Sequence, residues 1–357
     1  MKISKPVGLF HFSGVIDFKP SGKIKFGDDN EEYLFFFNNF LKKKFLYIQD
    51  INISNIDKFD TIIFVDIIDP EKILAKLKIS CNSKILIMRE CNVIMPKLWR
   101  KETINQYDYV FTYNTKYFKK IKTQSKIIEY LMPRKLDLDN SFYRMKRPFD
   151  YCMFASNKFS YHADELYSER VRVINFFNDN KILNFHLYGP DWNRFIIKYP
   201  ILSFISRKLI TIKKNLSIYK GIASNKIKVA SKYKFCFCYE NRKNFKGHVS
   251  EKIFDAMRAG CVPIYWGPED ADKYLDKSTY IDASKFKSIN DIYCYTQSLT
   301  KNDIDRLRKN IRNFLTHKAK KNFSLLKFSK KISKLIILFY LNQFYKLTLI
   351  KCNNYYK

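Results

Sequence analysis

The chain has 357 residues, of which 46% are hydrophobic, 17% aromatic and 28% charged, and it contains only 9 glycines. At roughly 150 residues per domain this length predicts two domains, and the apolar content is enough for large buried cores. Collagen-like, low-complexity, disordered and small disulfide-stabilised proteins are excluded by the same figures. Lys and Arg total 66 against 34 Asp and Glu, which gives a formal net charge of +32 and a sequence pI near 9.7.

This positive charge indicates a polyanionic partner, which could be nucleic acid, an anionic membrane or a phosphorylated substrate. Lys outnumbers Arg 52 to 14. Interfaces that read bases or clamp phosphates usually favour the planar guanidinium, so the bias speaks against sequence-specific nucleic-acid recognition. A bias in coding composition would give the same excess of Lys.

The 8 cysteines lack the spacing of a zinc site or a disulfide framework, since no CxxC pair occurs. We expect reduced, mostly buried thiols in a cytoplasmic protein. The first residues contain no continuous apolar stretch before Asp17, which is unlike a secretory signal. No run of about 18 uncharged apolar residues occurs, so no bilayer-spanning segment is expected.

Short apolar runs alternate with lysine-rich amphipathic stretches through the first half of the chain. Residues 61–68, 84–90 and 107–114 are predicted to be buried strands, and 70–80 has the spacing of a helix. Strands that alternate with helices indicate a parallel sheet. We therefore predict an α/β domain over residues 1–140.

A polar, proline-containing connector at 133–148 separates this domain from a second one. The same alternation resumes beyond it, so a second α/β domain is predicted over 149–305. Its predicted strands are 150–156, 184–190, 233–240 and 261–267, and its clearest helices are 168–179 and 250–260.

Residues 306–357 contain 14 Lys or Arg and no Asp or Glu. Apolar residues recur there at helical spacing, among them Leu325, Phe328, Ile332 and Leu335. A basic amphipathic helix of this kind commonly lies on anionic lipid, so we expect a helical tail at a membrane surface. The alternative is a helix packed on the protein with a solvated lysine face.

The segment 233–268 carries the strongest functional signal. A predicted strand ends at Glu240, and a helix begins at Ser250, a residue type that caps helix N-termini. The N–H groups and the dipole of a helix N-terminus bind anions, and Lys252 adds a positive charge there. Glu251 could accept hydrogen bonds from a pair of sugar hydroxyls. Because ligands bind beyond the carboxyl ends of strands in such sheets, this segment predicts a nucleotide-phosphate site.

The same segment resembles the donor-binding motif of family ten glycosyltransferases, the α-1,3/4-fucosyltransferases. That motif is a strand ending in Phe-Glu-Asn, a variable loop, Tyr-Val-Thr-Glu-Lys, a helix and Gly-x-Val-Pro-Ile/Val-x-x-Gly. This chain has Tyr-Glu-Asn at 239–241, His-Val-Ser-Glu-Lys at 248–252 and Gly-Cys-Val-Pro-Ile-Tyr-Trp-Gly at 260–267. His248 replaces a Tyr of the motif, and Ser250 replaces its Thr while keeping the capping hydroxyl.

The resemblance implies an inverting enzyme of the GT-B architecture, with two Rossmann-like α/β domains facing a cleft. The acceptor would bind the N-terminal domain, and a GDP-sugar would bind the C-terminal one. By the resemblance Glu90, which ends a strand and is soon followed by Pro96, would be the catalytic base. A partly desolvated carboxylate at the edge of a sheet suits this work. The alternative is a surface glutamate paired with Arg89.

Donor binding is implied for residues of the C-terminal domain. Arg170 fits the position of the family's arginine on the helix after the first strand of this domain, and Arg172 is the rival. Arg170 and Lys252 would neutralise the donor diphosphate in place of a divalent ion. The other residues implied in donor binding are Glu240, Asn241, His248, Ser250 and Glu251, the last of them at the ribose.

No obligatory cofactor or metal is expected, although stimulation by a divalent metal is left open. Two DxD sequences, Asp137 with Asp139 and Asp303 with Asp305, resemble the metal site of a different glycosyltransferase fold. The first lies in the connector rather than after a strand. The 5 histidines show no spacing typical of metal ligands.

We therefore predict transfer of L-fucose or a related deoxyhexose from a GDP-sugar to a glycan hydroxyl, such as one on N-acetylglucosamine of lipopolysaccharide. A cytoplasmic enzyme held at the inner face of the membrane by its tail fits this function. One alternative is a GT-B enzyme that uses another nucleotide sugar. The other is a basic nucleic-acid-binding protein, which would show steep salt dependence and indifference to Glu90→Gln; no nucleic-acid partner is expected.

Overall fold

The computed structural model describes the chain in segments, namely residues 6–11, 46–47, 58–182, 184–193, 216–335 and 337–338. The chain forms two compact units. The first unit comprises residues 1–135 together with 323–357, and the second comprises 136–322. The chain therefore begins in the first unit, builds the second, and then returns to the first.

The first unit is built on a parallel sheet that has six strands among the described residues, in the order β2-β1-β3-β4-β5-β6. The strands are β1 Pro6–His11, β2 Leu46–Tyr47, β3 Lys58–Val65, β4 Ser80–Ile87, β5 Tyr109–Thr112 and β6 Lys126–Glu129. The strand order reverses between β1 and β3. In open parallel sheets ligands bind at such a switch point, outside the carboxyl ends of the strands.

β3, β4 and β5 confirm the three strands predicted in this half of the chain. β3 is buried from its second residue onward, as is usual for a parallel strand between layers of helices. β4 ends at Ile87, so Glu90 follows the strand instead of ending it. Strands β1, β2 and β6 are not predicted from the sequence.

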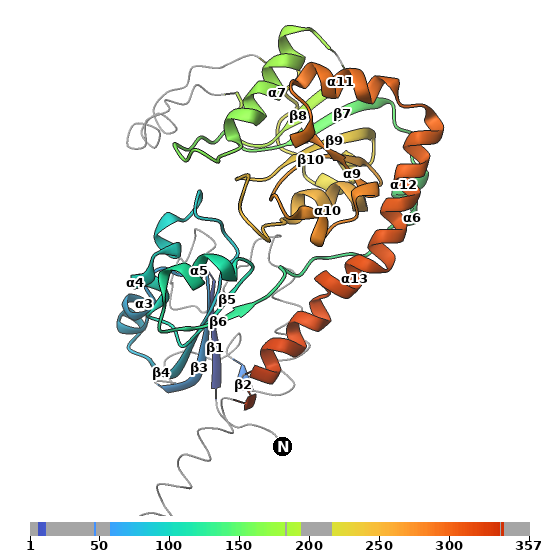
Figure 1. The fold of residues 1–357 in the computed structure, drawn as a ribbon. Coiled ribbons are helices and arrows are strands. Elements are labelled where there is room, and N and C mark those ends of the chain that lie inside the picture. The colour runs from blue at the N-terminus through green and yellow to red at the C-terminus, as the bar shows by residue number, and fades with distance from the viewer. Residues whose placement is uncertain are drawn as a thin grey trace, which may run out of the picture. The chain divides into compact units, whose positions relative to one another are not determined.

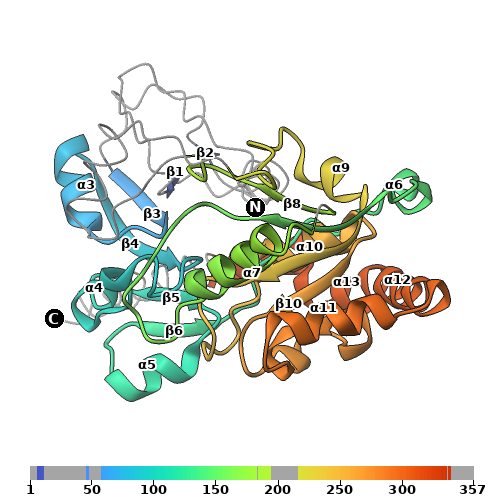
Figure 2. The same ribbon diagram turned by 90° about the horizontal axis from the view of Figure 1, so that it is seen from above.

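The helices of the first half are α3 Pro70–Leu77, α4 Lys101–Ile104 and α5 Thr115–Ile121. Helix α3 begins after Asp69, whose carboxylate accepts the N–H of Lys72 at 3.0 Å, with Pro70 in the first helical position. It confirms the helix predicted at 70–80. Helix α5 packs beside β6, as Figure 2 shows.

The second unit has a parallel sheet with five strands among the described residues, in the order β11-β10-β9-β7-β8. The strands are β7 Phe149–Phe154, β8 Phe185–Tyr188, β9 Tyr233–Tyr239, β10 Val262–Trp266 and β11 Ile281–Asp282. The four longer ones confirm the strands predicted from the sequence. This sheet also reverses its order, between β7 and β9, so its switch point lies between those two strands.

Helices cover both faces of this second sheet. They are α6 Asn140–Arg144, α7 Tyr167–Asp179, α9 Lys226–Ala230, α10 Glu251–Arg258, α11 Ile289–Ser298 and α12 Lys301–Thr316. Helices α7 and α11 pack together on one face, whereas α9 and α10 lie on the other (Figure 1). Helices α7 and α10 confirm the helices predicted at 168–179 and 250–260. The sequence between parallel strands therefore forms the crossover helices of a doubly wound α/β unit.

One glycine of this unit has no room for a side chain. Gly189 follows β8 with φ +136°, and a Cβ there would meet the carbonyl oxygen of Ala155 at 2.0 Å. Only glycine allows the two loops after β7 and β8 to approach so closely.

The described part of the predicted tail, residues 306–335 and 337–338, is divided between the two units. Helix α12 packs on α10 and β10 of the second unit. The helix α13, Lys318–Phe323, leads to a helical stretch at 325–335 that belongs to the first unit. There Phe328 lies against Tyr130, with ring centroids 5.5 Å apart. Two of the apolar residues that recur at helical spacing, Phe328 and Ile332, are therefore buried, with 5% and 0% exposure.

Several lysines of the stretch 325–335 remain exposed on the same helix, among them Lys330 and Lys334. Residues 339–357 lie outside the described part of the chain. None of the described helices is both long and apolar enough to cross a bilayer. Most cysteines in the described part are buried, and none of these is in a disulfide.

Candidate functional site

The residues singled out in the segment 233–268 gather at the carboxyl end of β9. Helix α7 follows β7, and helix α10 follows β9, so both helices connect to the strands that flank the switch point of the second sheet. Side chains from these two helices meet the chain where it leaves β9. This is the location at which α/β sheets of this kind bind ligands.

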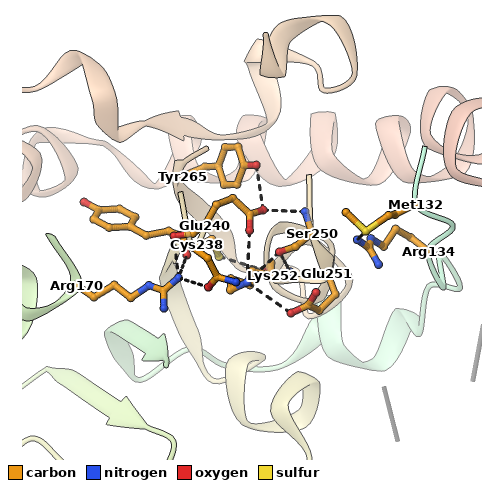
Figure 3. Close-up of polar contacts among 11 residues, drawn as sticks. Met132, Arg134, Arg170, Cys238, Glu240, Ser250, Glu251, Lys252 and Tyr265 are labelled. Atoms are coloured by element: carbon orange, nitrogen blue, oxygen red, sulfur yellow. Dashed lines mark hydrogen bonds and ion pairs between the residues drawn. The ribbon is translucent and has the colours of Figure 1, made fainter. Parts of the chain in front are cut away.

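Glu240 is the centre of this arrangement and is completely buried. Its Oε1 accepts the backbone N–H of Ser250 at 2.8 Å and the hydroxyl of Tyr265 at 3.1 Å. Its Oε2 lies 3.4 Å from Nζ of Lys252. Figure 3 shows these groups converging on the carboxylate. One carboxylate thus ties the end of β9 to the start of α10 and to β10.

The surroundings of Glu240 keep its carboxylate ionised. Burial by itself raises the pKa of Glu240, but the charges of Lys252 and His248 and the hydrogen bond from Ser250 outweigh burial and lower the pKa below its usual value. A buried carboxylate is costly unless it is paired and hydrogen-bonded. Here it is both, so Glu240 serves as a fixed negative charge that holds Lys252 at the helix N-terminus.

Arg170 extends from α7 to the same strand end and is 5% exposed. Its Nη2 donates to the carbonyl oxygens of Tyr239 and Glu240, both at 2.8 Å, and to Oδ1 of Asn241 at 2.9 Å (Figure 3). Its guanidinium also lies 4.8 Å from the ring centroid of Tyr167. The positive charge is therefore fixed at the point where the chain leaves β9.

The rival arginine lies elsewhere on the same helix. Arg172 is exposed, with a side-chain exposure of 72%, and pairs with Glu169 at 2.9 Å. The structure thus brings Arg170, and not Arg172, to the residues at 239–241. Helical geometry explains the difference, since residues two apart face away from each other.

The N-terminus of α10 combines a cap with a cation. Ser250 accepts the N–H of Lys252 at 3.4 Å, and Nζ of Lys252 lies 3.1 Å from the same hydroxyl oxygen. Glu251 is more exposed, at 43%, and its carboxylate lies 3.7 Å from that Nζ. The helix has eight residues, and its positive dipole end adds to the charge of Lys252. This end of α10 can therefore hold an anionic group.

His248 and Asn241 complete the predicted set. His248 is buried, with its ring centroid 6.4 Å from that of Phe245. Asn241 is half-buried and accepts twice, with its side chain from Arg170 and with its carbonyl oxygen from the N–H of Leu166 at 3.2 Å. The seven residues predicted to bind the donor thus lie either on α7 or in the segment that runs from the end of β9 to the first turn of α10.

A second tie joins the loop before α7 to the loop after β9. Asp164 accepts from Nη2 of Arg242 at 2.8 Å, and its carbonyl oxygen accepts the N–H of Lys243 at 2.9 Å. Burial raises the pKa of Asp164, but its bonds with Arg242 and Asn244 more than offset this and lower it. The two loops that border the site are therefore held together by hydrogen bonds and an ion pair.

Glu90 lies in the first unit, just after β4, and is half-buried. Its carbonyl oxygen accepts the indole N–H of Trp99 at 3.0 Å, and its own N–H donates to Oδ1 of Asp66 at 3.2 Å. Asp66 follows β3, the neighbouring strand in the sheet. Glu90 thus occupies the carboxyl edge of the first sheet, as expected from the sequence.

Three of the four DxD carboxylates have structural roles. Asp139 caps α6 by accepting the N–H of Ser141 at 2.8 Å, and Asp303 caps α12 together with Thr300. Asp305 pairs with Arg308 at 3.3 Å. Among the described residues, no group of three or more His, Cys, Asp or Glu side chains is arranged to hold a metal ion.

Two residues of these strand ends are not predicted from the sequence. Tyr265 has only its place in the motif to mark it, and its contact with Glu240 depends on the register in which β10 pairs with β9. Asp66 could have been noticed as a carboxylate just past an apolar run, which is the same signal that marks Glu90. Its contact with Glu90 depends on which strands are neighbours.

The segment that carries most of these residues is similar to a known protein family. Residues 207–329 match the family model described as "Glycosyltransferase family 10 (fucosyltransferase) C-term". The match includes β9, α10 and β10 and confirms the resemblance seen at 239–267. Glu90, Asp66 and Arg170 lie outside it.

Curated relatives include an α-(1,3)-fucosyltransferase FucT of Helicobacter pylori, which is 34% identical over 98 residues, or 27% of this chain and 20% of the relative. Another is the 4-galactosyl-N-acetylglucosaminide 3-α-L-fucosyltransferase 9 of Mus musculus, 31% identical over 81 residues, which are 22% of each chain. The alignments thus span about a fifth of the length of these two relatives.

Among solved structures, that of Anabaena Alr3699/HepE in complex with UDP-glucose matches with a TM-score of 0.54 at 8% identity, over 93% of this chain and 99% of the other. At this identity the likeness shows the fold alone. That fold is two parallel-sheet α/β units in one chain, which is the GT-B architecture expected from the sequence.

Proposed function

We propose that this chain, which carries the C-terminal region of family 10 glycosyltransferases at residues 207–329, transfers L-fucose or a related deoxyhexose from a GDP-sugar to a glycan hydroxyl. The observation that supports this most is the meeting of Arg170, Lys252 and the N-terminus of α10 at the end of β9. Two cations and a helix dipole at a sheet's switch point suit a diphosphate.

In this proposal the second unit binds the donor and stabilises the leaving group. As the bond between the sugar and the β-phosphate breaks, negative charge grows on the phosphate oxygens. Arg170 and Lys252 would meet that charge without moving, because Glu240 and the carbonyl oxygens at 239–240 already hold them. Losing one such preorganised group typically costs on the order of 100- to 1000-fold in turnover. Glu251, the more exposed acid, would hold the ribose hydroxyls.

The first unit would supply the base. Glu90 would take the proton of the acceptor hydroxyl while its oxygen attacks the anomeric carbon, and the diphosphate leaves from the opposite face. A single displacement of this kind inverts the anomeric configuration. No metal is needed in the scheme, because the cations of the second unit do the work of a divalent ion.

The acceptor we propose is a glycan containing N-acetylglucosamine, because the mouse relative is named for the 4-galactosyl-N-acetylglucosaminide on which it acts. Such a unit on a lipid-linked or lipopolysaccharide glycan would fit the basic C-terminal region. The alternative within the same fold is a different nucleotide sugar. The donor test below separates the two.

The donor site is tested without an acceptor, by thermal unfolding of the chain in the presence of GDP, UDP, ADP or CMP. A ligand at about 100 times its dissociation constant stabilises by roughly 2.7 kcal/mol. We expect stabilisation by GDP, its loss in Lys252→Ala, and its retention in Lys246→Ala. Lys246 is a matched control, since it lies in the same loop region but pairs with Glu269 at 3.1 Å. A shift that favours UDP, or none, contradicts the GDP-sugar assignment.

Transfer is then measured with GDP-fucose and a galactosyl-N-acetylglucosamine acceptor, following both GDP release and the linked product. We expect a product whose anomeric configuration is opposite to that of the donor, and a loss of at least about 100-fold in Glu90→Gln. Retained configuration, or an unchanged rate in Glu90→Gln, contradicts the proposed base and displacement while leaving the donor site intact.

We also propose that the chain works at the cytoplasmic face of a membrane and contacts anionic lipid through its basic C-terminal region. Two observations support this: the charge of residues 306–357, and the exposed lysines beside the buried side of the helical stretch 325–335. Co-sedimentation with phosphatidylglycerol vesicles should exceed that with phosphatidylcholine. It should fall in the double variant Lys330→Gln, Lys334→Gln. Equal binding to both lipids contradicts this proposal.

A further inference from the structure

Asp66 combines three features that a residue at the end of an ordinary strand does not need. It is 3% exposed, it carries a carboxylate, and its backbone has φ 54°, in the left-handed region. It also lies directly after β3, which flanks the switch point of the first sheet. A buried charge at this place requires an explanation, because an apolar residue would be cheaper to bury.

The hydrogen bonds of Asp66 lead to the last residue of β4 and to the segment that follows it. Its N–H donates to the carbonyl oxygen of Ile87 at 3.1 Å. Its Oδ1 accepts the N–H of Arg89 at 2.7 Å and the N–H of Glu90 at 3.2 Å. One residue therefore extends the pairing of β3 with β4 past the end of the ladder, up to the predicted catalytic base itself.

Other buried groups fix the same two strand ends. The hydroxyl of Tyr130 donates to the carbonyl oxygen of Met88, and that of Tyr107 to the carbonyl oxygen of Ile67, both at 2.7 Å. The indole N–H of Trp99 donates to the carbonyl oxygen of Glu90 at 3.0 Å. The backbone of Glu90 is thus held at its N–H by Asp66 and at its carbonyl by Trp99, so both sides of the residue are fixed.

The charges around Asp66 show that it is not simply one half of an ion pair. Burial raises the pKa of Asp66 to about 7, and the nearby negative charge of Glu90 adds to this effect. Arg89 and the two backbone N–H groups oppose the shift without cancelling it. Burial raises the pKa of Tyr107 and Tyr113, and the negative charge of Asp66 adds to both shifts. A carboxyl group therefore occupies this position although its surroundings disfavour the charged form.

We propose that Asp66 is a positioning residue for Glu90: its carboxyl oxygen binds the two consecutive backbone N–H groups at 89 and 90 and thereby fixes where the carboxylate of Glu90 points. This inference rests on the proposed function, in which Glu90 is the base. It assigns Asp66 a role in the proton transfer through another residue, without contact with the substrate. A displacement of about 1 Å at a reacting group can cost on the order of 100-fold in rate.

Two substitutions separate the carboxyl oxygen from the backbone shape. Asp66→Gly accepts the left-handed φ without strain but offers no side-chain acceptor to the N–H groups. Asp66→Asn keeps an oxygen acceptor and also tolerates left-handed φ, so it is the conservative variant. Asp60→Asn is the matched control, because Asp60 is also a buried carboxylate, 4% exposed, and lies near the start of β3, at the opposite end of the strand from Asp66.

The experiment measures kcat and acceptor KM with GDP-fucose, GDP-induced thermal stabilisation, and amide hydrogen exchange of residues 88–91. For Asp66→Gly we expect kcat to fall about 10- to 100-fold with KM nearly unchanged. GDP stabilisation should be retained, and exchange at 89 and 90 should be faster. Asp66→Asn should recover most of kcat and of the exchange protection, and Asp60→Asn should resemble the wild type in kcat.

Full kcat in Asp66→Gly overturns the inference, and so does a loss of kcat in Asp66→Asn as large as in Asp66→Gly, since the oxygen acceptor would then not be what matters. Losses that follow thermal stability equally in the Asp66 and Asp60 variants overturn it as well. In all these cases the wild type is active, and the proposed function stands. A wild-type chain that binds GDP but transfers nothing removes the proposed base, and this inference with it.

Discussion

Asp66 and Glu240 occupy equivalent places in the two units. Each is a buried carboxylate just past the carboxyl end of a strand that flanks the switch point of its sheet. Each also accepts backbone N–H: Glu240 from Ser250 at the start of α10, and Asp66 from the two residues at 89–90 just after β4. Their environments differ in sign. Burial raises the pKa of both, but at Glu240 the charges of Lys252 and His248 and the hydrogen bond from Ser250 outweigh it and lower the pKa. At Asp66 burial raises the pKa to about 7, and the negative charge of Glu90 adds to the shift.

The difference shows how an acidic residue at the same position of the fold can have two roles. A carboxylate with cationic partners holds those cations in place, and so prepares the second unit for an anionic ligand. Asp66 instead uses its carboxyl oxygen to fix the backbone at 89 and 90. Position in the fold selects the residues that take part, and the neighbouring charges decide what they do.

The largest effect is expected from removing the carboxylate that has cationic partners. Glu240→Ala leaves Lys252, the N–H of Ser250 and the hydroxyl of Tyr265 without their common acceptor. Removing one partner of a buried pair costs about 3–5 kcal/mol, so we expect a loss of that size in urea unfolding, with loss of GDP stabilisation. Glu240→Gln keeps an oxygen acceptor and should lose less. Equal stability of Glu240→Ala and the wild type would show that the carboxylate does not organise the site.

Arg170→Lys tests whether the fixed guanidinium matters, beyond its charge. The Nη2 of Arg170 meets all three acceptors at 239–241 while the planar guanidinium lies over the ring of Tyr167. A lysine ammonium is a compact point charge on a flexible chain and cannot reproduce both contacts. We expect the Kd for GDP, measured by calorimetry, to rise at least about 10-fold, or about 1.4 kcal/mol. Arg172→Lys, on the exposed face of α7, is the control and should change Kd by less than about 2-fold. The reverse order of effects would restore Arg172 as the donor residue.

The acidic half of the comparison predicts a pH dependence of stability. Asp66 has a higher pKa in the folded chain than in the unfolded one, so its proton favours the folded state at low pH. That advantage is lost as pH rises through about 7, and ionised Asp66 then opposes folding. Asp66→Asn should remove this loss, which we expect to be on the order of 1–3 kcal/mol.

The measurement is urea unfolding of the wild type and of Asp66→Asn at pH values from 4 to 8. The free energy of unfolding of the wild type, relative to that of the variant, should fall with increasing pH across this range. Asp60→Asn serves as the reference for a buried carboxylate of the same strand. A difference that does not change with pH, or that rises with it, would mean that Asp66 is ionised without cost.

The smallest effect should come from the tie between the two loops of the second unit. Asp164→Asn removes the charge that pairs with Arg242, and both side chains are partly exposed, at 27% and 13%. Such pairs contribute about 0.2–1 kcal/mol. We expect stability to fall by no more than this and GDP affinity to fall by about 2- to 3-fold, measured by calorimetry. A tenfold loss of affinity would make this tie part of the donor site itself.

Much of the fold follows from local sequence. The apolar runs at 61–68 and 233–240 become β3 and β9, and Ser250 begins α10 as its chemistry predicts. The residues of the donor motif are contiguous or nearly so, and therefore their gathering at one strand end could be predicted. Arg170 is predicted only by the resemblance to the family's helix arginine, and the structure brings it to that strand end.

The rest depends on contacts between segments that are distant in sequence. The contact of Asp66 with Glu90 spans 24 residues, and that of Tyr265 with Glu240 spans 25. Neither can be derived without knowing which strands are neighbours and in which register. Burial of Phe328 likewise depends on Tyr130, far earlier in the chain, so an amphipathic pattern alone could not show what its apolar side packs against.

The return of the chain to the first unit has a consequence for its synthesis on the ribosome. Residues 136–322 form one uninterrupted unit, whereas the first unit also needs the stretch that carries Phe328 and Ile332. Domains usually fold in the order in which they emerge. Here the unit whose synthesis begins first is completed last. The side of Tyr130 that Phe328 covers has no such cover until the whole second unit has been translated.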